Sequence, residues 1–128
     1  MKIRKMDKLD KMLDLREGFM TALKEKNDSI LPPWPVNVAQ KEAQQVLRET
    51  VLKGVEEMFE ALGHLKNWKP HRETEVTEFD REEFLEEFVD GMNYFFSVLV
   101  LLGHDANDLF RVYEKKDKII HDRIRKGY

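Results

Sequence analysis

The sequence contains no cysteine, and this absence excludes two kinds of structure. Neither a disulfide framework nor a thiolate-ligated zinc site can form in the 128-residue chain. Long hydrophobic runs are also missing, because the apolar stretch MNYFFSVLVLLG is far shorter than the roughly 20 residues that span a bilayer. The charged start, MKIRKMDKLDKML, lacks the apolar stretch of a signal peptide. We therefore expect a cytoplasmic protein with no membrane partner.

Proline is scarce, and three of the four prolines fall in the segment ILPPWPVN. Proline lacks a backbone donor and disfavours helix in the residue before it, so this segment predicts a stiff, extended connector that carries Trp34. The remaining composition, 41% hydrophobic and 37% charged, is that of an ordinary globular chain. A monomer of this size buries only about two thirds of its unfolded surface. We expect residues 1–128 to form a single domain that benefits from partner subunits.

No strand pattern competes with the helical spacing of the apolar residues. Met6, Leu9, Leu13, Met20 and Leu23 predict a first helix that ends before Asn27. A second helix is expected over 39–66, a third from the Asp-x-x-Glu sequence at 80–83 to Gly103, and a fourth after Asp105. In the fourth helix we expect the apolar residues Phe110, Tyr113, Ile120 and Ile124 to face the core. The predicted fold is therefore all-α, with four main helices.

Two pairs of acidic residues have the spacing of a metal site. Glu57 and Glu60 lie in the second predicted helix, and Glu87 and Asp90 lie in the third. An i/i+3 spacing places both carboxylates of a pair on one helix face, so two facing helices would offer four hard oxygen ligands. Such a quartet predicts a magnesium site suited to phosphate chemistry.

A solvated helix face is the simpler interpretation of the same acids, and for the pair at Glu57 and Glu60 it is the commoner one. The third helix favours a covered site more strongly. Its acidic face continues as Tyr94, Val98 and Leu101, in a stretch that is apolar nearly all round. Since unpaired buried carboxylates cost several kcal/mol, a cation would be expected beside them.

Basic residues gather at the end of the chain, with seven bases against three acids over 111–126, whereas 73–90 holds nine acids against one base. The basic segment could bind a triphosphate, bind nucleic acid, or offset the dipole of its own helix. Nucleic acid is disfavoured because the segment lacks interleaved aromatic residues and the acidic block would repel a polynucleotide. A small phosphate ligand fits better.

These motifs together resemble the all-α nucleotide pyrophosphatases, which include MazG-type enzymes, dimeric dUTPases and phage dCTP/dUTP pyrophosphatases. The Glu-Glu-x-x-Glu of residues 56–60 and the Glu-x-x-Asp of residues 87–90 are similar to the acidic motifs of this superfamily. The ending YEKKDKIIHDRIRKGY resembles the YxxKNxxNxxRQxxGY ending of the dimeric dUTPases and the phage enzymes. The shared positions of the ending are Tyr113, Lys116, Arg123, Gly127 and Tyr128.

The resemblance implies a MazG-like helical bundle completed by a second subunit, as a homodimer or homotetramer. It also implies hydrolysis of a deoxynucleoside triphosphate to the monophosphate and pyrophosphate, with Mg²⁺ or alternatively Mn²⁺ as cofactor. The implied roles are metal binding by Glu57, Glu60, Glu87 and Asp90, water activation by Glu57 or Glu60, phosphate binding by Lys116 and Arg123, and nucleotide binding by Asn27, Trp34 and Tyr128.

Four positions depart from the family's sequence pattern, and they bear on how the nucleobase would be recognised. The family's glutamine in the first helix is Arg16 here, and three polar positions of the ending are Asp117, Ile120 and Ile124. A second hypothesis within the same class is therefore a MazG-like housecleaning enzyme that acts on noncanonical or other nucleoside triphosphates. A hypothesis from a different class is a non-catalytic helical module that contacts a protein partner and needs no divalent cation.

Overall fold

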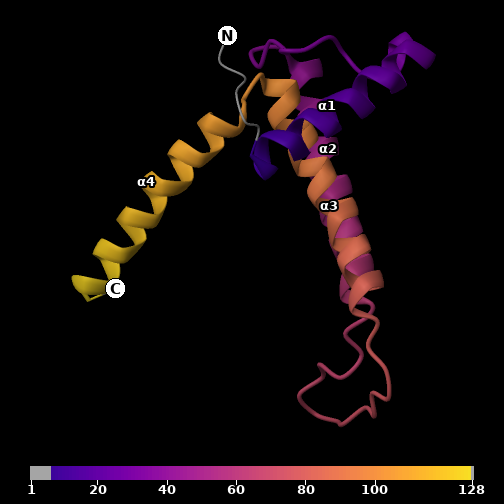
Figure 1. Cartoon of the computed structure of the whole chain (residues 1–128), viewed down its shortest axis with the longest axis vertical. Helices are drawn as coiled ribbons and strands as arrows, with labels where there is room; N and C mark the ends of the chain where they lie inside the picture. The colour runs from indigo at the N-terminus through magenta and orange to yellow at the C-terminus, as the bar shows by residue number, and fades with distance from the viewer. Residues whose placement is uncertain (1–6, 128) are drawn as a thin grey trace. The chain divides into compact units, whose positions relative to one another are not determined.

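The computed structural model describes residues 7–127, and these residues form helices without any strand. The main helices are α1 (Lys8–Lys26), α2 (Lys41–Leu62), α3 (Arg81–Leu102) and α4 (Ala106–Arg125), with a short 3-10 helix, η1 (Asp28–Ile30), after the first (Figure 1). The predicted all-α fold with four main helices is confirmed. No helix of residues 7–127 is long and apolar enough to cross a membrane.

Helix α1 begins and ends near the predicted limits. The Asp7 side chain caps it by accepting a hydrogen bond from the Asp10 backbone N–H at 2.8 Å. Leu13 and Met20 of the predicted apolar stripe are buried, while Met6 lies outside the described residues. The helix ends at Lys26 because Asn27 is extended and its side chain already caps η1.

Helix α2 is shorter than the predicted 39–66 and stops at Leu62. The backbone N–H groups of Gly63, His64 and Leu65 bond to carbonyls three residues back, which tightens the chain into a turn and ends the α-helical pattern. Leu65, which falls within the predicted range, therefore lies outside the helix and is exposed.

Side-chain caps set the starts of α3 and α4 where the sequence predicts them. Asp80 accepts from the Glu83 backbone N–H at 2.9 Å. Asp105 and Asp108 form a reciprocal capping box, each side chain bonding the other's backbone N–H. Between the two helices Gly103 has a φ of +80°. Glycine adopts this left-handed conformation without the steric strain that a Cβ atom would cause.

The chain forms two compact units, each described here by itself. Residues up to Pro35 and from Leu99 onward make one, and Val36–Val98 makes the other. In the first unit, Leu13 and Met20 of α1 are buried together with Val100, Leu101 and Ala106. The connector of this unit contains a cis peptide bond between Trp34 and Pro35. The amino group of Lys24 ties the connector to α1 by donating to the carbonyls of Asp28 and Leu31, at 3.0 and 2.8 Å.

In the second unit α2 and α3 lie side by side as an antiparallel hairpin (Figure 1). The two helices approach closely because a glycine faces a large side chain at two levels. Gly54 of α2 faces the Phe95 ring, and Gly91 of α3 faces Met58. A Cβ atom built on Gly54 would lie 2.6 Å from the ring, closer than any van der Waals contact. The missing side chains are what allow this packing.

The expectation that Phe110, Tyr113, Ile120 and Ile124 face the core is wrong for the single chain. All four side chains are exposed, and Tyr113 is 71% exposed. Helix α4 has the amphipathic pattern that the sequence predicts, but nothing in the described chain covers its apolar stripe. Periodicity identifies an apolar face without saying which molecule covers it.

Alanine substitutions at two glycines test the close packing of the hairpin. Alanine in a helix is intrinsically better than glycine by roughly 1 kcal/mol, and Gly18 of α1 has open space around its Cα. Gly18→Ala should therefore raise the free energy of unfolding. Gly54→Ala should lower it by about 1 kcal/mol, because overpacking costs about 1–3 kcal/mol and exceeds the helix gain. Urea unfolding followed by circular dichroism measures both, and an equal gain for the two variants would contradict the packing.

Candidate metal centre

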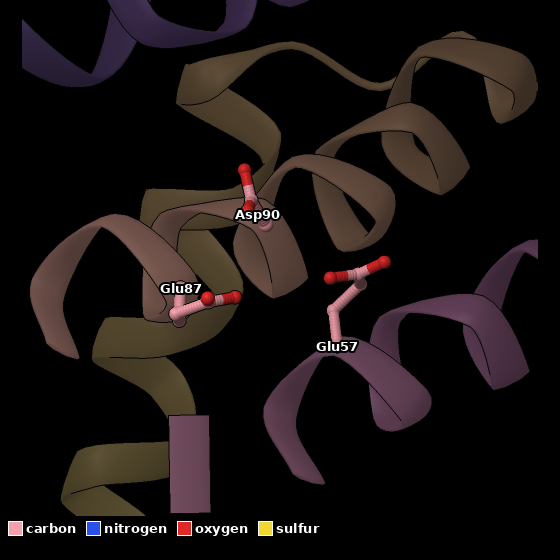
Figure 2. A group of neighbouring side chains, drawn as sticks. All are labelled: Glu57, Glu87 and Asp90. Carbon is pink, nitrogen blue, oxygen red and sulfur yellow. The ribbon is translucent and has the colours of Figure 1, made fainter. Parts of the chain in front are cut away.

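Three carboxylates meet on one side of the α2–α3 hairpin. Glu57 comes from α2, and Glu87 and Asp90 come from α3 (Figure 2). One oxygen of each lies within 4.8 Å of the others. Glu57 and Glu87 are half-buried and Asp90 is exposed, so the group, called here the acidic triad, is open to ligands.

The backbone of the hairpin positions the triad. Glu87 and Asp90 are one helical turn apart and point to the same side of α3. Glu57 immediately precedes Met58, which packs against Gly91, so the close approach at Gly91 brings Glu57 to the acids of α3. The same contacts that hold the hairpin together therefore assemble the triad.

Negative charge accumulates at the triad without an ion-pair partner among residues 7–127. None of the ion pairs within residues 7–127 involves Glu57, Glu87 or Asp90. The pKa of Glu57 is raised above its ordinary value of 4.5, first by partial desolvation and then by Glu60, with Asp90 and Glu87 adding further repulsion. A bound cation would relieve this repulsion.

The oxygen separations can be compared with those of a divalent-ion site. Magnesium binds oxygens at about 2.1 Å in octahedral geometry, so two ligands lie about 3.0 Å apart when adjacent and about 4.2 Å apart when opposite, and three ligands include at most one opposite pair. The triad oxygens lie within 4.8 Å of one another, so binding one ion would require them to draw together by up to roughly 1.8 Å. Rotation of the carboxylate side chains can supply such a change, and water would complete the octahedral shell. The donor set therefore fits Mg²⁺ or Mn²⁺ chemically.

The fourth predicted ligand, Glu60, is exposed and lies outside the acidic triad. It remains close enough to Glu57 to raise that residue's pKa through its charge and a side-chain hydrogen bond. The structure thus brings three of the four predicted acids together and leaves Glu60 beside one of them.

Asn27 and Trp34, two of the predicted nucleotide-binding residues, belong to the other unit. The Asn27 side chain accepts hydrogen bonds from the Ser29 backbone N–H and hydroxyl, at 3.2 and 2.8 Å, and so has a structural role at the end of α1. The Trp34 indole N–H donates to Glu17 at 2.8 Å. Lys116 and Arg123 are exposed on α4. Tyr128 lies outside the described residues.

A cleft of about 600 Å³ in the first unit was not expected from the sequence. Trp34 borders it, together with acids of α1 and the turn between α3 and α4, which carries His104. The Nδ1 atom of the His104 ring lies 3.2 Å from the Asp108 carboxylate. The backbone N–H of Asp105, followed by His104, lowers the pKa of Asp108. Acids on α1 spaced at 10, 14 and 17 were the only sequence signal for the cleft.

Comparison of the chain with protein-family models, with curated proteins and with solved structures gives no match. A functional inference therefore depends on the residues themselves and on the motifs that they form.

Removal of the Glu57 charge tests the repulsion within the triad. The raised pKa means that the folded chain holds the Glu57 proton more tightly than the unfolded chain does. The ionised residue therefore destabilises the fold above its folded pKa, and this effect disappears as the pH falls below 4.5. Glu57→Gln should be more stable than the unsubstituted chain at pH 7, with the difference vanishing near pH 4.

Denaturant unfolding at the two pH values measures this difference. Glu49→Gln, which removes the charge of an exposed acid of α2 outside the triad, is the control and should change little at either pH. A Glu57→Gln variant that is equally or less stable at pH 7 would contradict repulsion within the triad.

Proposed function

We propose that this chain is a Mg²⁺-dependent pyrophosphohydrolase of deoxynucleoside triphosphates, similar to dUTPases and dCTPases. The observation that carries the proposal is the acidic triad, in which carboxylates from two helices lie within 4.8 Å without a cationic partner among the described residues. Exposed acids alone are usually just solvated. This group differs because close helix packing holds like charges together, an arrangement that a divalent ion would stabilise.

In the proposed site, Glu57, Glu87 and Asp90 would hold the ion through their hard oxygens. Bound Mg²⁺ would neutralise phosphate charge and lower the pKa of a coordinated water. Glu60, which is exposed beside Glu57, would accept the proton of the attacking water, and Glu57, whose pKa is raised, is the alternative base. No covalent nucleophile is required for this reaction.

The remaining parts of the proposal come from the resemblance in the sequence. Lys116 and Arg123 would neutralise triphosphate oxygens, Arg123 through its planar fork and Lys116 as a compact charge. Trp34 borders a cleft and would contact the base, together with Asn27 and Tyr128. The proposed active form is a homodimer or homotetramer with a MazG-like bundle completed between subunits.

The substrate base separates two versions of the proposal. Arg16, Asp117, Ile120 and Ile124 replace polar residues of the dUTPase pattern. These departures are the ground for the alternative that the chain is a MazG-like housecleaning enzyme for noncanonical or other nucleoside triphosphates. Rates on a panel of triphosphates, including dUTP, dCTP and modified nucleotides, would rank the two versions.

Pyrophosphate release from this panel, with and without Mg²⁺, tests the activity directly. We expect release only with the metal, and a loss of about 100-fold or more for Asp90→Asn or Glu60→Gln. The matched control is Glu86→Gln, an exposed acid of α3 outside the triad, which should keep its rate. Circular dichroism would verify that each variant stays helical. A chain that hydrolyses no triphosphate would instead support the non-catalytic interaction module.

Metal binding is testable without any nucleotide. Mg²⁺ at ten times its dissociation constant should stabilise the fold by about 1.4 kcal/mol, a rise in melting temperature of a few degrees. Asp90→Asn should lose this shift while Glu86→Gln keeps it. Sodium chloride of equal ionic strength is the control for charge screening. An equal shift in both variants, or with sodium chloride alone, would contradict a specific ion at the triad.

A further inference from the structure

The cleft of the first unit has a shape and a lining that suit a flat aromatic ligand. Its volume of about 600 Å³ falls within the range of small-molecule sites, which is about 300–1,000 Å³. The buried side chains of Leu13, Val100 and Ala106 give it an apolar part, and Trp34 adds an aromatic ring. Apolar and aromatic side chains bind the flat, weakly hydrated surface of a nucleobase.

Carboxylates dominate the polar part of the lining. Asp10, Asp14 and Glu17 recur on one side of α1, within about 60° of one another at 100° per residue. Asp105, at the start of α4, is the fourth acid. No lysine or arginine of residues 7–127 lines the cleft. Because a carboxylate accepts hydrogen bonds and donates none, the cleft favours a ligand edge that carries N–H donors.

Three of these acids are exposed, and one of the three is available to a ligand. Glu17 accepts the hydrogen bond of the Trp34 indole N–H at 2.8 Å, which holds the ring in place. Asp105 caps α4 by accepting from the Asp108 backbone N–H at 2.9 Å. The Asp14 carboxylate makes no hydrogen bond or ion pair within residues 7–127. Both of its oxygens can therefore accept hydrogen bonds from a ligand.

We propose that Asp14 recognises the base of the substrate and that this base is guanine. Among the common bases only guanine has two adjacent donors on its Watson–Crick edge, N1–H and the N2 amino group, and these match the two oxygens of one carboxylate. Adenine, cytosine, uracil and thymine each have an acceptor beside the donor on that edge, and a carboxylate would repel it. This inference rests on the proposed pyrophosphohydrolase and specifies the base in its second version.

Substrate analogues test the paired donors without any change to the protein. The value of kcat/KM for dGTP should exceed that for dATP and dUTP by about 10–100-fold, the range of one good bidentate contact to a base. It should exceed that for dITP, which lacks the N2 amino group, by about tenfold. Equal values for dGTP and dITP, or a higher value for dATP or dUTP, would overturn guanine recognition while leaving the pyrophosphohydrolase proposal intact.

A change of one atom in the protein should shift the preferred base. In Asp14→Asn the amide offers one acceptor and one donor, which match xanthine, where a carbonyl replaces the amino group of guanine. The ratio of kcat/KM for dXTP to that for dGTP should therefore rise by about 10–100-fold. Trp34→Leu should weaken all bases alike, because every base has a π-face. Glu114→Gln, at an exposed acid of α4 outside the cleft, is the control and should keep the original ranking. An equal loss for all bases in Asp14→Asn would contradict base recognition by Asp14.

Equilibrium binding separates recognition of the base from hydrolysis. Calorimetric titration with dGMP, dAMP and dUMP requires no reaction, and dGMP should bind about tenfold or more tightly than the other two. Asp14→Asn should abolish this preference. A preference for dGMP in a chain that hydrolyses no triphosphate would support the base site and refute the proposed activity. Equal binding of the three monophosphates would overturn the base site, even in a chain that releases pyrophosphate.

Discussion

The close approach of α2 and α3 is the contact on which the rest of the second unit depends. Gly54 admits the Phe95 ring and Gly91 admits Met58, and both contacts require that a side chain be absent. Close packing of this kind is sensitive to a single added methyl group. The approach determines which side chains of the two helices become neighbours. The acidic triad on one side of the hairpin follows from it.

Electrostatics and packing oppose each other at the triad. Helix packing brings Glu57 to Glu87 and Asp90, while partial desolvation, then Glu60 and the two acids of α3, raise the pKa of Glu57. A chain selected only for stability would place a cation or a neutral residue there. A conflict between packing and charge repulsion is typical of functional sites, where residues that lower stability are kept because they serve the function. It is the physical basis for proposing a metal centre at this position.

Exposed apolar residues occur in both units. The apolar stripe of α4 and several apolar residues of the hairpin, Val55, Phe59 and Leu85 among them, are exposed in the described chain. Amphipathic helices gain most of their stability from burying the apolar side, so the assembly proposed above would stabilise the chain by covering such residues.

Local sequence signals determined the helices and their starts. Apolar periodicity predicted four helices without strands, and the side chains of Asp80 and Asp105 cap α3 and α4 where the pattern placed them, since capping depends on residues within one turn. The sequence also predicted that Glu87 and Asp90 lie on the same face of α3, because helical geometry alone places residues spaced i/i+3 on one side. The end of α2 was harder to predict. The backbone hydrogen bonds after Leu62 are of the 3-10 type, and a 3-10 turn differs little in energy from a continued α-helix.

Only the tertiary structure decided which of these faces meet. It joined Glu57 to the acids of α3 and left Glu60 beside them, a distinction that i/i+3 spacing cannot make. It also left Phe110 and Tyr113 of α4 exposed where periodicity suggested a core. The reason is physical: a helix's own sequence defines its apolar and charged sides through local geometry, whereas the partner of each side depends on contacts between residues far apart in the chain.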